Sequence, residues 1–200
     1  MRLLFTRHGE TDWNIAKRVQ GTTDVPLNEN GIRQAEILCR NLQKMNVKLF
    51  RIYSSYQSRA LATARIVGKG FDVPVKVVPG LEEMNLGKFE GHTWREIETL
   101  YSQELKEWQS DKRYHMAPNG ESYQMVLERL FAALDRIMDE GKEEQALDKD
   151  VLIVSHGAVI MTLLALKDDI PFEQAYTIDV ENARAIEIEL SQLQEIRRKL

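Results

Sequence analysis

The sequence contains a single cysteine, Cys39, among its 200 residues. One cysteine excludes an internal disulfide framework, a zinc-binding cysteine cluster and a Cys-x-x-Cys redox motif. Long hydrophobic runs are also missing, because no apolar segment approaches the roughly 18 residues that a membrane-spanning helix requires. The segment before Arg7 is too short for the apolar core of a signal peptide. We therefore expect a cytoplasmic protein with no membrane partner.

An excess of positive charge is the next feature that the sequence lacks. Lysine and arginine total 27 against 31 aspartates and glutamates, so the formal net charge is -4. Nucleic-acid-binding domains usually carry a clear basic excess, and we expect no nucleic-acid partner. With 43% hydrophobic and 29% charged residues, the composition is typical of a globular protein. We expect one domain over residues 1–200, large enough to bury a core without disulfides or metals.

Short apolar segments alternate with amphipathic ones along the chain. Candidate strands cover residues 3–5, 49–53, 73–78, 151–154 and 183–190, and candidate helices cover 28–45, 58–67, 122–140, 159–166 and 193–200. This alternation predicts an α/β three-layer sandwich, with a mainly parallel central sheet and helices on both faces. Residues 183–190 alternate between apolar and charged side chains, which indicates an edge strand. Residues 88–120, rich in aromatic and charged side chains, predict a small helical insertion.

Polar segments follow three of the predicted strands. They are Arg7-His8-Gly9, Ser54-Ser55 with Arg59 shortly afterwards, and Ser155-His156-Gly157. The carboxyl ends of parallel strands share one edge of a sheet, where ligands of α/β proteins bind. Two histidines and two arginines at that edge would form a cationic pocket that attracts anions. We expect this edge to be the active site and the helical insertion to cover it.

The Arg7-His8-Gly9 motif carries the densest chemical signal. A guanidinium beside an imidazole suits a phosphoryl group, which needs both charge neutralisation and a nucleophile. Gly9 would let the backbone approach a ligand closely. Taken alone, the motif is equally compatible with a surface arginine and a hydrogen-bonded histidine at the end of a strand.

Taken together, the motifs resemble the histidine phosphatase superfamily, the phosphoglycerate-mutase-like family, over nearly the full length of the chain. The similar segments, in order, are Arg7 to Asn14, Gln20-Gly21 with Asp24, Pro26 and Leu27, Gly31, Gln34-Ala35, Ser54-Ser55, Arg59-Ala60, Thr63-Ala64, Leu81-Glu82-Glu83, Gly87, Glu90-Gly91, Gly120-Glu121-Ser122 and Ser155-His156-Gly157. Tyr56-Gln57 departs from the family, which usually has Asp-Leu there. The departure concerns the entry to the following helix and leaves Arg59 in place.

The resemblance implies a role for each candidate site residue. His8 would attack phosphorus and form a phosphohistidine, and it must be neutral to do so, a state that nearby cations favour. Glu83 would protonate the leaving oxygen and then deprotonate the attacking water. We prefer Glu83 to Glu82 because the family spacing Leu-x-Glu-x-x-x-Gly fits Leu81, Glu83 and Gly87. The residues expected to bind the phosphoryl group are Arg7, Asn14, Gln20, Gly21, Arg59, His156 and Gly157, of which Arg7, Arg59 and His156 would also stabilise the transition state.

The implied function is a phosphomonoester hydrolase that acts on small phosphorylated metabolites, releases inorganic phosphate, and uses neither a metal nor a cofactor. One alternative is a cofactor-dependent phosphoglycerate mutase. The family's mutases carry Arg-His-Tyr directly after the catalytic glutamate, whereas this chain has Met84-Asn85-Leu86, which offers no charge for a carboxylate. A second, weaker alternative is an inactive protein that binds phosphorylated ligands. The sequence does not indicate an oligomeric state.

Overall fold

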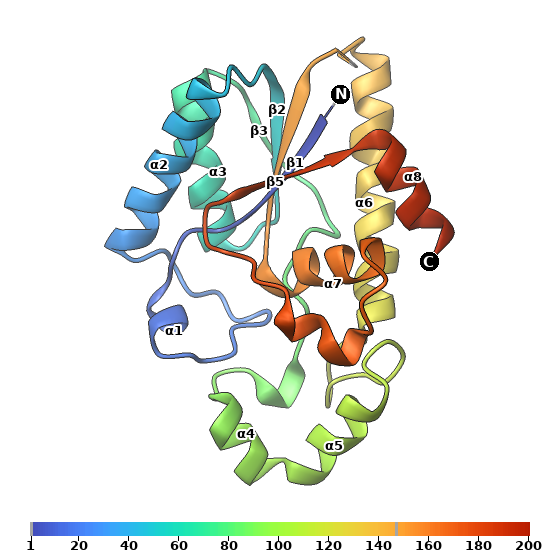
Figure 1. Ribbon diagram of the computed structural model, residues 1–200. Helices are drawn as coiled ribbons and strands as arrows, with labels where there is room; N and C mark the ends of the chain where they lie inside the picture. Colours follow the sequence, from blue (N-terminus) through green and yellow to red (C-terminus); the bar gives the residue numbers. More distant parts are fainter. Residues whose placement is uncertain (1, 147) are drawn as a thin grey trace.

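The computed structural model describes residues 2–146 and 148–200 and contains a five-stranded sheet in the order β3-β2-β4-β1-β5 (Figure 1). The strands are β1 (Arg2–Arg7), β2 (Leu49–Ser54), β3 (Val75–Val77), β4 (Asp150–Ser155) and β5 (Ala185–Glu189). Strands β1 to β4 pair in parallel, and β5 pairs antiparallel with β1 at the edge of the sheet. The predicted mainly parallel sheet and its edge strand are confirmed.

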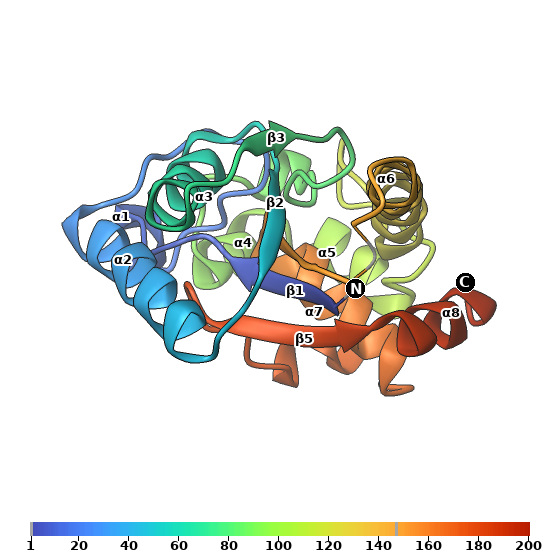
Figure 2. The ribbon, with the colours of Figure 1, turned by 90° about the horizontal axis from the view of Figure 1, so that it is seen from above.

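Apolar side chains of the strands alternate between two cores, one on each face of the sheet. In β1, Leu3 and Phe5 pack into the larger core, whereas Leu4 packs into the smaller one. Helices α2 (Glu29–Lys44) and α3 (Ser58–Phe71) cover the smaller core. Helices α6 (Tyr123–Glu143), α7 (Gly157–Lys167) and α8 (Leu190–Arg198) cover the larger core on the opposite face (Figure 2). The predicted three-layer sandwich is therefore confirmed.

The boundaries of several elements differ from the prediction. Helix α3 extends four residues beyond the predicted end and stops where Asp72 adopts a left-handed conformation, with φ 53°. Strand β5 is shorter than residues 183–190 at both ends. Ala183 has φ 52°, which interrupts the extended backbone, and Leu190 already belongs to α8. The periodic pattern located the elements, but local backbone geometry set their ends.

Residues 88–120 form the predicted helical insertion, which lies beyond the carboxyl ends of the parallel strands (Figure 1). A 3-10 turn, η1 (Gly87–Phe89), leads into α4 (Trp94–Leu100) and α5 (Ser102–Ser110). Phe89 and Trp108 are buried and meet edge to face with ring centroids 5.8 Å apart, so part of the insertion is a local aromatic core. Two short elements were not predicted, α1 (Asp12–Ile15) and η2 (Phe172–Thr177).

Candidate active site

Three parallel strands end at one edge of the sheet and bring the predicted polar segments together. Arg7 is in register with Ser155, and the His8 N–H donates to the Ser155 carbonyl at 3.1 Å. A cavity of about 310 Å³ lies at this edge. Residues predicted for the site that line it are Arg7, His8, Asn14, Gln20, Gly21, Glu83 and Gly157. Arg59 and His156, the two other predicted residues, are fully buried beside His8.

The contacts of the His8 ring fix its protonation. Its Nδ1 lies 2.7 Å from the Gly9 carbonyl, which can only accept, so Nδ1 carries the proton. The Nε–H of Arg59 donates to His8 Nε2 at 3.2 Å, so Nε2 holds the lone pair. Desolvation, with the positive charges of Arg7 and Arg59, lowers the pKa of His8 well below 6.5. His8, 1% exposed, is thus a neutral imidazole with its free lone pair on Nε2.

The backbone on either side of the His8 ring is held from distant parts of the chain. The Asn182 amide donates to the His8 carbonyl at 2.8 Å, and the Gly9 N–H donates to the Thr63 hydroxyl at 3.0 Å. A Cβ at position 9 would lie 2.3 Å from the Gly31 carbonyl oxygen at the start of α2. Gly9 is therefore needed for packing against α2, which differs from the close ligand approach that we expected.

Two buried side-chain nitrogens next to His8 have no hydrogen-bond partner among the described residues. His156, whose ring centroid is 5.2 Å from that of His8, meets the Ser55 hydroxyl through Nε2 at 2.7 Å, while its Nδ1 is unpaired. Arg7 donates from Nη1 to the Val180 carbonyl at 3.1 Å, but its Nε is unpaired. Desolvation is the largest cause of the lowered pKa of both side chains. Each unmet buried donor costs about 1–3 kcal/mol, which an anionic ligand would offset.

Arg59 connects His8 to the loop that carries Gly21. Its Nη2 donates to the Gly21 carbonyl at 2.9 Å, and its Nη1 donates to the Thr23 carbonyl at 2.8 Å. On the other side of this loop, the Glu90 carboxylate accepts from the N–H groups of Thr22 and Thr23 at 2.8 and 3.1 Å. Gly21 has φ 50°, and a Cβ there would lie 2.1 Å from Glu90 Oε1, so any other residue would be strained and would displace Glu90.

Two further predicted residues, Asn14 and Gln20, reach the cavity from the segment after β1. Asn14 is the third residue of α1, and its Oδ1 accepts the Thr11 N–H at 3.0 Å in a capping box. That contact orients the amide and leaves its NH₂ group without a partner among the described residues. Gln20 is buried, and its Oε1 is likewise unpaired.

Glu83, and not Glu82, lines the cavity. Glu83 Oε1 accepts the Met84 N–H at 2.9 Å, and Oε2 lies 3.4 Å from the Ala158 N–H in the first turn of α7. Glu82 instead accepts the Gly80 N–H at 2.7 Å and lies 3.8 Å from Arg129. The family spacing therefore selected the carboxylate that faces the His8 pocket.

Sequence reasoning missed two side chains that hold the Glu83 segment in place. Gln57, which is fully buried, accepts the Glu83 N–H at 2.8 Å and donates to the Gly21 carbonyl at 2.9 Å. Arg129 of α6 donates to the carbonyls of Glu82 at 2.7 Å and Glu83 at 3.2 Å. The departure from the family at Gln57 was the available signal for the first. Arg129 lies in an amphipathic helix, where nothing in the pattern distinguishes it.

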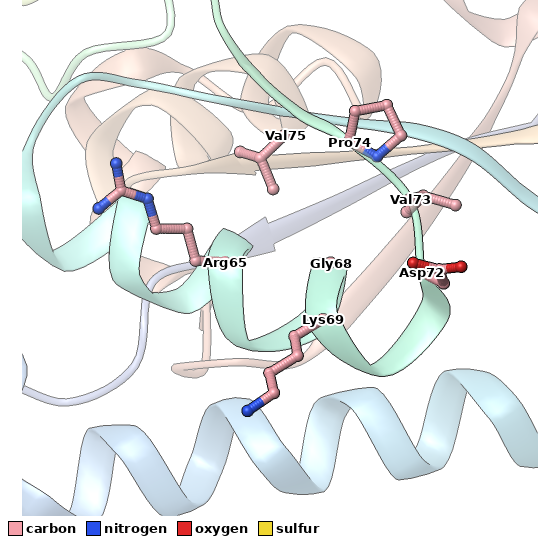
Figure 3. Close-up of a pocket in the computed structure, with 7 residues that line it drawn as sticks. All are labelled: Arg65, Gly68, Lys69, Asp72, Val73, Pro74 and Val75. Carbon is pink, nitrogen blue, oxygen red and sulfur yellow. The ribbon is translucent and has the colours of Figure 1, made fainter.

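The two remaining histidines lie outside the His8 pocket. The His92 ring packs against Tyr101 with ring centroids 5.6 Å apart, and exposed His115 contacts the Glu107 carbonyl at 2.8 Å. A separate cavity of about 530 Å³ lies between the end of α3 and the segment leading to β3, and contains none of the predicted site residues (Figure 3).

Within residues 2–146 and 148–200, no helix is suited to crossing a bilayer, and no cluster of three or more His, Cys, Asp or Glu could hold a metal ion.

Comparisons with known proteins identify the family. The model of the histidine phosphatase superfamily (branch 1) matches residues 3–196, and the chain belongs to this superfamily. It is 33% identical to the adenosylcobalamin/alpha-ribazole phosphatase of Salmonella typhimurium over 184 residues, covering 90% of this chain and 86% of the relative. It is 34% identical to phosphoglycerate mutase-like protein 4 of Arabidopsis thaliana over 163 residues, covering 80% and 68%. The structure of Bacillus stearothermophilus YhfR is similar, with TM-score 0.81, 34% identity, and coverage of 94% and 90%.

Proposed function

We propose that this protein hydrolyses phosphomonoesters of small metabolites through a phosphohistidine intermediate and releases inorganic phosphate. The observation that carries the proposal is the state of His8, a buried neutral imidazole whose Nε2 holds a lone pair. The unpaired Nε–H of Arg7 beside it, and the unpaired Nδ1 of His156 in the tautomer that carries a proton there, support an oxyanion as the ligand. Membership of the superfamily, whose relatives include a named phosphatase, supports the same reaction.

The proposed reaction has two steps, transfer of the phosphoryl group to His8 and then its transfer to water. In the first, His8 Nε2 attacks phosphorus, and an N–P bond forms as the P–O bond to the alcohol breaks. Glu83 gives its proton to the departing alkoxide oxygen. In the second, water attacks phosphorus while Glu83 takes a proton from it, and the N–P bond breaks as phosphate forms. His8 and Glu83 then return to their starting states.

The phosphoryl oxygens are proposed to contact the donors that the described chain leaves unpaired. These include Nε of Arg7, Nδ1 of His156 and the NH₂ group of Asn14. The remaining proposed contacts come from Gln20, Gly21 and Gly157, which line the cavity, and from the two N–H groups of Arg59 that no described contact uses. Fixed positive charge of this kind stabilises the developing charge in the transition state, and we propose a reaction that needs no metal or organic cofactor.

The segment after Glu83 favours hydrolysis over phosphoglycerate mutase activity. A mutase must hold the carboxylate of its sugar acid while the phosphoryl group returns to a second hydroxyl. Met84 and Leu86 are buried and apolar, and Asn85 carries no charge. The segment therefore provides no cation for that carboxylate.

Turnover of p-nitrophenyl phosphate in the presence of EDTA tests the proposal. We expect wild-type activity to persist, His8→Ala to lose at least about a thousandfold, and the matched exposed variant His115→Ala to match wild type. An acid-labile, base-stable phosphoryl label on wild type and its absence from His8→Ala would support the intermediate. Full activity of His8→Ala would refute it. Isomerisation of 3-phosphoglycerate faster than phosphate release would favour the mutase.

We further propose that residues 1–200 act as one catalytic domain with an insertion at about 88–120. Trp94 of the insertion lines the same cavity as His8, which supports a single unit. A cytoplasmic location is also proposed, and it is supported by Cys39, a buried free thiol that suits a reducing compartment.

A further inference from the structure

A second cavity, different from the one in Figure 3, adjoins the His8 pocket on the side of the insertion. Its volume is about 670 Å³, and Trp94 and Met161 line both spaces. Tyr123 lines the second cavity, and its pKa is raised by burial and then by the charges of Glu83 and Glu173. The two cavities therefore share part of their walls, at Trp94 and Met161.

Aromatic rings form much of the wall of the second cavity. Trp94 and Trp108 stack nearly parallel, with an interplanar angle of 5° and centroids 6.1 Å apart. Trp94 is 45% exposed and Tyr176 is 72% exposed, although both are large and partly apolar. Aromatic surface left open around a concave space is typical of a site for a flat, apolar ligand.

A buried lysine also lines this cavity. Lys112 is only 7% exposed as a residue, its ammonium group keeps some contact with water, and among the described residues that group makes no hydrogen bond and no ion pair. It lies 4.7 Å from the centroid of the Trp108 ring and 5.6 Å from that of Tyr176. Desolvation lowers its pKa, while Glu173 opposes that effect from a distance. A cation that is largely removed from water and has no anionic partner in direct contact is stabilised by a ligand that brings a negative charge.

The other charged groups around the cavity differ from Lys112 in their exposure. Glu98 and Glu173 line it as well, but both are exposed to water, which screens their charge. The buried part of the lining therefore offers a cation and aromatic faces. This combination selects a ligand that has both a flat apolar body and an anionic end.

We propose that the second cavity binds the alcohol portion of the substrate, and that the preferred substrates are phosphomonoesters of aromatic alcohols that carry a carboxylate. The carboxylate pairs with Lys112, and the aromatic ring lies against Trp94 and Trp108. This inference rests on the proposed phosphatase activity, because it concerns the leaving group of that reaction.

Two aryl phosphates that differ in one charge test the inference. The phosphate ester of 3-(4-hydroxyphenyl)propionate carries the carboxylate, and 4-butylphenyl phosphate has a similar length and a similar leaving group without it. At pH 7, wild type should hydrolyse the carboxylated ester with a kcat/KM about tenfold or more above that of the butyl ester. Equal values for wild type would overturn the inference without involving any variant.

Substitutions on and near α5 separate the effect of Lys112 from general damage. Lys112→Met should lower kcat/KM for the carboxylated ester by about 10- to 100-fold and change the butyl ester less than about twofold. Lys112→Arg should retain part of the preference, and exposed Lys106→Met, which removes the same charge nearby, should retain all of it. Equal losses on both esters would overturn the inference. Failure of wild type to hydrolyse either ester would instead count against the phosphatase activity itself.

Discussion

Replacing Gln57 by methionine removes two buried hydrogen bonds from one side chain. Methionine has a similar length and no hydrogen-bonding amide, so the packing volume changes little. The Glu83 N–H loses its acceptor, which costs about 1–3 kcal/mol for a buried group, whereas the Gly21 carbonyl still accepts from Arg59. We expect the free energy of unfolding to fall by about 2 kcal/mol, as measured by urea denaturation.

Catalysis by the Gln57→Met variant should depend on the leaving group. Glu83 donates the proton in the step proposed here, and its backbone loses one of the contacts that place it. An alkyl phosphomonoester needs that proton, so its kcat/KM should fall by about 10- to 100-fold, part of the usual contribution of a general acid. p-Nitrophenyl phosphate has a stable leaving anion and should lose much less. kcat/KM is the proper quantity because it includes steps only up to release of the alcohol.

A matched control and a clear contrary result complete this experiment. Gln43 also donates from its amide to a backbone carbonyl, that of Gly70 at 2.8 Å, but it is exposed and far from the cavity. Gln43→Met should leave the ratio of the two kcat/KM values unchanged. Equal losses on both substrates for Gln57→Met, or no loss of stability, would refute the reasoning.

Two further predictions concern the histidines and the Gly21 loop. Burial lowers the folded-state pKa of His8 and His156 below that of the unfolded chain, so the unfolded state binds more protons below about pH 6.5. The contribution of these histidines to the free energy of unfolding is therefore full above that pH. It falls as the pH decreases toward the folded-state pKa, by up to about 1.4 kcal/mol per pH unit for each histidine. Urea unfolding from pH 7 to 5.5 checks this, and a pH dependence of the unfolding free energy that is unchanged in His156→Gln would contradict it. Gly21→Ala should lower the free energy of unfolding by about 1 kcal/mol or more, because position 21 has a positive φ and the new Cβ would meet Glu90. Tm should then fall by about 2–4 °C, and KM should rise. An unchanged Tm and KM would show that the loop adapts.

Periodicity predicted the elements of the fold because each one packs an apolar face against a core. Asn28 shows how local chemistry helps, since its side chain accepts the Gly31 N–H at 2.8 Å and starts α2 at the expected residue. The end of β5 was not predictable in this way, because Leu190 continues the alternating pattern but already belongs to α8. Apolar periodicity reports which face is buried, and it carries less information about where a backbone turns.

The sequence predicted the site residues that directly follow a strand. It did not predict those that contact the site from a distant part of the sequence. His8 and His156 follow β1 and β4 directly, so the parallel sheet places them together. Gln57 and Arg129 reach the Glu83 segment from 26 and 46 residues away in sequence. No spacing rule encodes contacts of that kind, because they depend on how α3 and α6 pack. The exposed side chains of the insertion likewise gave no sign that Lys112 is buried.

The last strand of the sheet has a consequence for how the His8 segment acquires its native position. Asn182 and Ala183, just before β5, hold the backbone of His8 and Arg7 through contacts of 2.8 and 2.9 Å, and β5 then covers the open side of β1. Asn182 follows His8 by 174 residues in sequence. A chain that contains His8 but lacks the segment from Asn182 to β5 therefore loses the contacts that hold the His8 backbone. Variants truncated before residue 182 should release no phosphate, and their unpaired β1 edge would be available to chaperones.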